Sequence, residues 1–188
     1  MVSYRLVIQY CETALRAAGG TVSAALMSDL YSMQARAYAR IGDRQSAHTH
    51  MTFAESTVGR IRNEEEPAET SYIQPGLAET QHVEVLRHLG DLSAAEHYAV
   101  AAVRTAKEAH LRSQVHRYAS LATILIQRGR VDEALEPAHQ MLNRIYGMES
   151  GRLHDRLNAV HAALLARSTT PDVCEFTNRA AAELALGL

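Results

Sequence analysis

One stretch near the middle of the chain decides the fold: His88-Leu89-Gly90-Asp91-Leu92-Ser93-Ala94-Ala95-Glu96. Its glycine separates two segments with helical periodicity, and Gly42 and Gly129 lie in the same kind of position. An alanine follows each of the three glycines by five residues, and a large residue precedes each by four: Ala47, Ala95 and Ala134, and Tyr38, Leu86 and Leu125. The chain therefore contains an internal repeat centred on glycine.

The spacing of this repeat has a direct physical meaning. Glycine adopts the left-handed conformation that ends a helix, so the chain can turn there and start a second helix antiparallel to the first. Alanines on the facing surfaces let the two backbones approach, and the large residue fills the space beside them. Each pair leaves an apolar edge that the next pair in a stack buries. The repeat therefore predicts stacked antiparallel helix pairs.

We expect an all-α fold, a right-handed α-solenoid of antiparallel helix pairs, because no run alternates apolar and polar residues for long enough to indicate a strand. The periodicity predicts about nine helices, over residues 3–17, 23–41, 45–62, 76–89, 93–108, 112–128, 132–146, 150–167 and 171–186. Some helix starts carry capping signals. Ser93 and Glu96 form a capping box, Asp132 can cap the seventh helix, and Thr170 precedes a first-turn proline, Pro171.

These helices are expected to form a single helical repeat domain over residues 1–188. Its predicted parts are repeat units at 23–62, 76–108 and 112–146, a partial preceding unit at 1–20, a linker at 63–75, and C-terminal capping helices at 150–188. Within the linker, the acidic run 63–67 is expected to be solvated. Tyr72 and Ile73 are expected to pack against the second pair or over the groove, because burial of apolar surface is favourable.

Composition excludes several classes of protein. At 188 residues with 47% hydrophobic content the chain can bury its own core, and its formal charge of −2 with interleaved acids and bases gives no footprint for nucleic acid. No run approaches the roughly 20 apolar residues of a spanning helix, so no membrane association is expected. The two cysteines, Cys11 and Cys174, lie near opposite ends and are expected to be reduced thiols, which indicates a cytoplasmic protein.

The pattern resembles the tetratricopeptide repeat, whose first helix ends with the Gly-Asp pair seen at 42–43 and 90–91. The third unit has Gly129-Arg130, and the glycines are 48 and 39 residues apart, longer than the family's period of roughly 34. Residues 37–43, 88–96 and 127–134 are similar to the C-terminal half of bacterial regulators that join a helix-turn-helix to such repeats. The resemblance covers about residues 23–165. It implies a regulatory, partner-binding domain of a transcription regulator, with the DNA-binding module outside this chain.

In such a stack the first helix of each pair lines a groove, and groove positions can be counted back from each glycine. The candidate ligand-binding positions are Arg36, Arg40, Gln81, Glu84, Arg87, His88, His116, Thr123 and Gln127, with Asp29, Ser32, Met33 and Ser120 on the same faces. Arginine, glutamate, histidine and amide side chains suit an extended peptide that is held through its backbone and one carboxylate, which a guanidinium can bind bidentately. We expect a peptide or protein partner, or a small-molecule effector.

Catalytic and metal-binding patterns are weak. The ten histidines include His48 and His50, which point to different sides of a helix, and His154 and His161, which share a face without a third ligand. No HExxH, CxxC, EF-hand or phosphate-loop motif is present, so we expect no metal, no cofactor and no enzyme activity. A free-standing scaffold or adaptor is the alternative to the regulatory domain, and an enzyme is the last choice.

The first predicted helix indicates self-association. Its apolar residues occupy more than one face: Val2, Tyr4, Leu6, Val7, Ile8 and Tyr10. A terminal helix of a repeat array is normally polar outside, so this surface is expected to contact another helix or a second subunit. We expect a homodimer.

Overall fold

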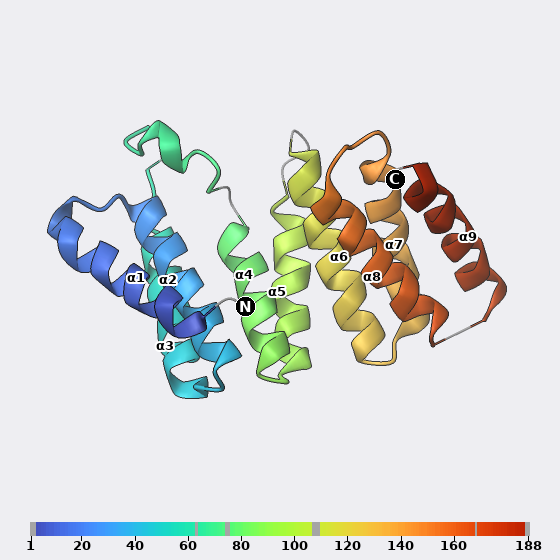
Figure 1. Cartoon of the computed structure of the whole chain (residues 1–188), viewed down its shortest axis with the longest axis horizontal. Helices are drawn as coiled ribbons and strands as arrows, with labels where there is room; N and C mark the ends of the chain where they lie inside the picture. The colour runs from blue at the N-terminus through green and yellow to red at the C-terminus, as the bar shows by residue number, and fades with distance from the viewer. Residues whose placement is uncertain (1–2, 63, 74–75, 107–109, 168, 187–188) are drawn as a thin grey trace. The chain divides into compact units, whose positions relative to one another are not determined.

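The computed structural model describes residues 3–62, 64–73, 76–106, 110–167 and 169–186, and every regular element in these ranges is helical (Figure 1). The α-helices are α1 (Tyr4–Ala18), α2 (Ala24–Arg40), α3 (Arg44–Val58), α4 (Leu77–His88), α5 (Leu92–Arg104), α6 (Leu111–Gln127), α7 (Val131–Ile145), α8 (Gly151–Leu165) and α9 (Pro171–Leu186). Short 3-10 turns occupy Gly19–Thr21 and Ala68–Thr70. The prediction of an all-α chain is confirmed.

The chain divides into two compact units, Met1–Tyr98 (unit 1) and Ala99–Leu188 (unit 2), with the division inside α5. In unit 1, α2 packs against α3 and also against α1 and α4. In unit 2, α6 packs against α7 and α8, and α7 also packs against α9. Each unit thus shows helices packed both on the next helix and on the next but one, which is a repeat-like arrangement.

The three predicted corners have the same backbone geometry. Gly42, Gly90 and Gly129 have φ of 84°, 79° and 77°, the left-handed region that favours glycine. The amide after each glycine donates to the carbonyl oxygen of the large residue four before it, at 3.0, 3.0 and 2.9 Å, on Tyr38, Leu86 and Leu125 respectively. This bond closes the end of the first helix in the manner of a Schellman motif. The repeat in the sequence therefore corresponds to the same helix-ending turn at three places in the structure.

Two of the predicted caps are wrong. The Asp91 carboxylate accepts from the Ala94 amide at 3.0 Å, so α5 is capped two residues earlier than the predicted Ser93. Asp43 caps α3 in the same way, through Ser46. The helix after the third corner starts at Val131, which places Asp132 inside the first turn rather than at the cap position. The aspartate directly after the glycine is the residue that the turn leaves in a capping conformation.

Most helix ends lie within two residues of the predicted ones, but α3 and α5 each end four residues earlier than predicted. The helix α3 ends at Val58, not at Arg62, because the Arg60 and Ile61 amides bond to the carbonyl oxygens three residues earlier and unwind the helix. The helix α9 begins at Pro171, as predicted. The predicted end of the fifth helix, Glu108, lies outside the described residues.

Small residues lie where helices approach most closely. Ala35, Ala47 and Ala54 are completely buried between α2 and α3, and Ala122, Ala134 and Ala138 are completely buried between α6 and α7. Larger side chains of unit 2 complete its core, including Met141, Leu157 and Phe176, none of which is exposed. In the part of the chain that the structure describes, no helix is both long and apolar enough to cross a membrane.

The corner geometry predicts opposite effects for two glycine-to-alanine substitutions. An added Cβ would meet no atom within 4 Å at either Gly90 or Gly59, so the backbone conformation alone determines the change in stability. We expect Gly90→Ala to destabilise unit 1 by about 1–2 kcal/mol, because alanine is strained at φ 79°. Gly59, at φ −61°, is the matched control, and its alanine variant should be neutral or slightly more stable. Urea unfolding followed by circular dichroism measures both, and equal losses would contradict the assignment of the corner.

Candidate functional site

Two of the predicted groove residues meet in unit 1. The Arg36 guanidinium of α2 donates to the Gln81 side-chain oxygen of α4 at 2.6 Å. Arg36 is exposed, and within the described residues this is the only hydrogen bond of its side chain. Among the residues that the structure describes, this guanidinium therefore bonds to a neutral amide and forms no ion pair.

The next turn of α4 carries a second polar group of this face. The Arg87 guanidinium forms an ion pair with the Glu84 carboxylate at 2.8 Å, and both side chains are about three-quarters buried. The His88 Nδ1 lies 2.8 Å from the Glu84 carbonyl oxygen. Arg87 is thus neutralised within its own helix, and an incoming carboxylate would have to compete with Glu84 for it.

Arg40 does not join this group. Its guanidinium lies over the Tyr4 ring of α1, 5.6 Å from the ring centroid, which is a cation–π geometry. Arg40 therefore contacts the preceding helix rather than the polar side chains of α4.

The candidate residues of unit 2 all come from α6. His116 is half-buried, and its pKa is lowered by burial and then by Arg156 and Arg152 of α8. The Thr123 hydroxyl donates its proton to the Ala119 carbonyl oxygen at 2.7 Å, so it can only accept a hydrogen bond from a ligand. Gln127 is exposed at the end of the helix. The helices α6 and α8 together carry four arginines and one acid, Asp155, although one of these arginines, Arg117, is buried and donates to the Ala102 carbonyl oxygen.

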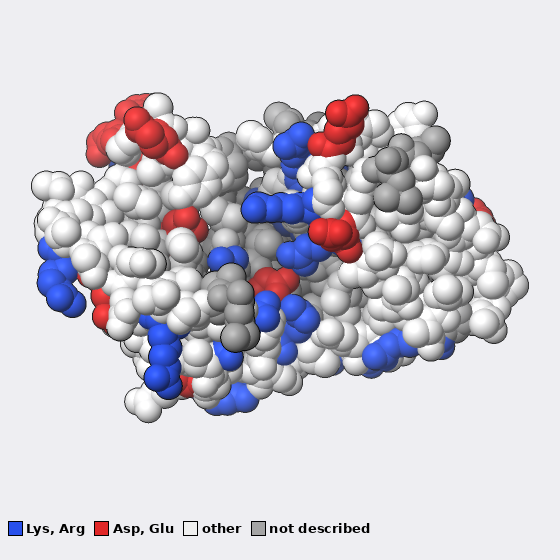
Figure 2. Space-filling view, in the orientation of Figure 1, with Lys and Arg blue, Asp and Glu red and all other residues white. Residues whose placement is uncertain are grey.

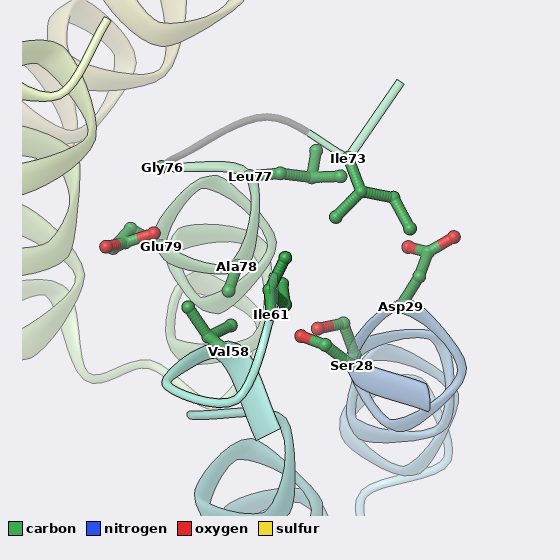
Figure 3. Close-up of a pocket in the computed structure, with 10 residues that line it drawn as sticks. Ser28, Asp29, Val58, Ile61, Ile73, Gly76, Leu77, Ala78 and Glu79 are labelled. Atoms are coloured by element: carbon green, nitrogen blue, oxygen red, sulfur yellow. The ribbon is translucent and has the colours of Figure 1, made fainter. Parts of the chain in front are cut away.

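A pocket that the sequence analysis did not anticipate lies in unit 1, with a volume of about 190 Å³ (Figure 3). It is lined by residues of α2, the end of α3, the segment between α3 and α4, and the first turn of α4: Ser28, Asp29, Ser32, Val58, Ile61, Ile73, Gly76, Leu77, Ala78 and Glu79. The side chains of Leu77 and Ile73 point toward each other, with Asp29 close to Ile73, and Glu79 points away on the other side of α4. The segment between α3 and α4, which makes this repeat longer than usual, therefore forms one wall of a cavity.

The segment between α3 and α4 is tied back to α2 by two side chains. The Tyr72 hydroxyl donates to Asp29 Oδ2 at 2.8 Å, and burial together with this bond raises the pKa of Tyr72 to about 12. Ile73 is half-buried against the pocket, as expected, although the Tyr72 ring remains over half exposed. The carboxylate of Glu66 accepts from the Ala25 amide at 3.2 Å and completes the N-terminus of α2.

The contact of Glu66 corrects the prediction that residues 63–67 form only a solvated run. Residues 64, 65 and 67 are exposed as expected, but Glu66 is half-buried at the start of a helix. Asn63 and the end of the predicted linker, residues 74 and 75, lie outside the described residues.

A second buried polar group lies between α3, α4 and α5 in unit 1. His82 is completely buried, with its Nδ1 3.3 Å from Glu55 Oε1 and its ring edge-on to Tyr98 at 5.1 Å. Although this distance is short, neither ring nitrogen of His82 has a hydrogen bond of normal geometry among the described residues. Burial lowers the pKa of His82 to about 4 against the opposing effect of Glu55, so the ring is neutral.

The metal ligands, cysteines and first helix considered in the sequence analysis do not form a further site among the described residues. Within the described ranges no three His, Cys, Asp or Glu side chains are grouped so that they could hold a metal. Cys11 is buried and Cys174 exposed, and both are free thiols. On α1, Leu6 and Tyr10 are 46% and 70% exposed, so self-association through this helix stays a prediction.

Comparison with family models, with curated proteins and with solved structures found no match to this chain. The fold and these side chains are therefore the basis on which a function can be inferred.

Proposed function

We propose that this chain is a tetratricopeptide-like, right-handed helical array that binds an extended segment of a partner protein and catalyses no reaction. Three corners with the same turn and the repeat-like packing of each unit support the architecture. In such arrays the first helices of the pairs provide the binding face. Here those helices are α2, α4 and α6, and they carry the polar side chains described above.

The observation that carries the proposal is the exposed guanidinium of Arg36, fixed at 2.6 Å by the amide oxygen of Gln81. The bond orients the planar group without neutralising it, so the remaining N–H groups can bind a carboxylate. A peptide with one acidic side chain or a terminal carboxylate matches this chemistry. The surplus of arginine on α6 and α8 also favours a negatively charged partner.

The test uses three arginine-to-alanine variants and a partner identified by mass spectrometry of proteins that copurify with the wild type. We expect Arg36→Ala to weaken binding of the partner's acidic segment by about tenfold or more, since a charge-assisted hydrogen bond is lost. Arg87→Ala should weaken it less, because Glu84 already pairs with Arg87. Isothermal titration measures each affinity.

Arg60 is the matched control, because it is an exposed arginine of unit 1 outside the predicted face. Its alanine variant should bind the partner as the wild type does. Equal losses in the Arg36 and Arg60 variants would show that only net charge matters, and an unchanged affinity of the Arg36 variant would discard the assigned face.

We also propose that this array is the regulatory part of a bacterial transcription regulator, on the strength of the resemblance in residues 37–43, 88–96 and 127–134. Binding of the partner would then shift the population of conformations of the array. The genomic reading frame provides the test. A helix-turn-helix encoded upstream in frame supports the proposal, and a stop codon directly upstream contradicts it.

A further inference from the structure

The geometry points to the unit 1 pocket as a binding site for a small organic cation: an aliphatic stem that ends in an ammonium group, as in an alkylamine or a lysine side chain. This inference rests on the pocket alone and not on the proposed function, because Arg36 and Arg87 do not line the pocket. It assigns a ligand class to a site that the repeat pattern did not reveal.

The walls of the pocket select an aliphatic stem. Val58, Ile61, Ile73, Leu77 and Ala78 provide apolar surface from three separate segments of unit 1. The volume of about 190 Å³ is below the roughly 300 Å³ at which pockets for drug-sized ligands begin. The occupant is therefore the size of one side chain, with enough apolar surface to gain from burial.

The wall formed by α2 selects a hydrogen-bond donor. Ser28 is 2% exposed and donates its hydroxyl proton to the Ala54 carbonyl oxygen, so toward the pocket it can only accept. Ser32 is 1% exposed and also lines the pocket. Asp29 accepts the Tyr72 proton with one carboxylate oxygen and keeps the other. Two buried hydroxyl oxygens beside a carboxylate suit a ligand that carries several N–H groups.

The charge around the pocket selects a cation. The segment from residue 59 to residue 79 carries five acids and two arginines, and Asp29 adds a sixth acid from α2. Glu64, Glu65 and Glu69 are exposed on the segment between α3 and α4, where Figure 2 shows a group of acidic side chains. The N-terminus of α4 also borders the pocket and would favour an anion, but Glu79 in its first turn already complements that dipole. The Asp29 carboxylate lines the pocket and therefore attracts an ammonium group and repels a carboxylate, and the more distant exposed acids add only a weak, screened field.

The experiment titrates the full chain with three probes of equal length, namely pentylammonium, pentan-1-ol and pentanoate. Amide shifts in ¹H–¹⁵N NMR spectra report binding at Ser32 and Ala78. We expect pentylammonium to bind at least about tenfold more tightly than pentan-1-ol, because it adds a charge-assisted hydrogen bond. Pentanoate should cause no saturable shift at these residues.

Three variants locate the site. Asp29→Asn keeps an acceptor for Tyr72 and should weaken binding of pentylammonium by about tenfold while leaving pentan-1-ol unchanged. Glu64→Gln removes the same charge from the exposed part of the segment and should change either affinity by less than about twofold. Ala78→Leu fills the pocket and should abolish binding of both probes, with circular dichroism to check that the variant is folded.

Two peptides separate the two sources of the ammonium group. A capped Gly-Lys-Gly peptide that binds more tightly than its norleucine counterpart identifies a partner's lysine side chain, and binding of pentylammonium alone identifies a free amine. Both results support the cation site. Tighter binding of pentanoate, equal effects of the Asp29 and Glu64 variants, or no saturable shift with any probe would each overturn it.

Discussion

Replacing Phe176 with alanine is expected to lower the free energy of unfolding of unit 2 by about 3–5 kcal/mol. Phe176 lies on α9 and is completely buried in the core cluster of unit 2, and its ring is edge-on to His139 of α7 at 5.3 Å. Truncation removes the burial of a large aromatic group and leaves a cavity that packed helices fill only in part. Urea unfolding followed by circular dichroism at the helical band measures the loss.

The chain has one other phenylalanine, which provides a matched control. Phe53 on α3 is 44% exposed, and its ring contacts the rings of Tyr31 at 5.3 Å and His50 at 5.7 Å. The same substitution at Phe53 should cost only about 1–2 kcal/mol, the size of one or two aromatic pairs. A loss at Phe53 as large as that at Phe176 would mean that burial does not determine the energetics of these helices.

The corners of the fold could be predicted because they depend on local conformation. A left-handed turn requires glycine at one position, and close helix approach requires alanine at a fixed distance from it, so both leave a periodic trace in the sequence. The residues that cap the helices were harder to predict. Ser93 and Asp91 both match a capping pattern, and only the turn at Gly90 decides that Asp91 is the residue outside the helix.

The candidate site could be predicted only where it follows the repeat. Arg36 and Gln81 lie six and nine residues before their corner glycines, so counting placed them on facing turns of α2 and α4, where they meet. Arg40 was counted in the same way but contacts Tyr4, because the count takes no account of α1.

The pocket has no local signal of this kind. The segment between α3 and α4 lacks helical periodicity, and its position is set by contacts between residues far apart in the sequence. Glu66 bonds to Ala25 and Tyr72 to Asp29, over separations of 41 and 43 residues. The acidic composition of the segment was visible from the start, but that one carboxylate caps a helix and that Ile73 closes a cavity depends on tertiary structure.

Unit 1 is expected to lose stability as the pH falls from about 6.5 to about 4, by about 3 kcal/mol from His82 alone. The ring has its ordinary pKa of 6.5 in the unfolded chain and a pKa of about 4 in the fold, where burial is the larger effect and the Glu55 carboxylate opposes it. Between these two values the unfolded state binds a proton that the folded state does not. Acid therefore favours unfolding in this window, and the contribution is fully present above pH 6.5.

The measurement is the urea-unfolding free energy at a series of pH values for the wild type and two histidine variants. His82→Phe keeps an aromatic ring beside Tyr98 and should remove most of this dependence, leaving the smaller contribution of the same sign from His116, whose pKa is also lowered by burial. His48→Gln, at an exposed position of α3, should leave the wild-type slope unchanged. A His82→Phe slope equal to that of the wild type would show that His82 has the same pKa in the fold as in the unfolded chain, in which case the Glu55 carboxylate at 3.3 Å would fully offset the effect of burial.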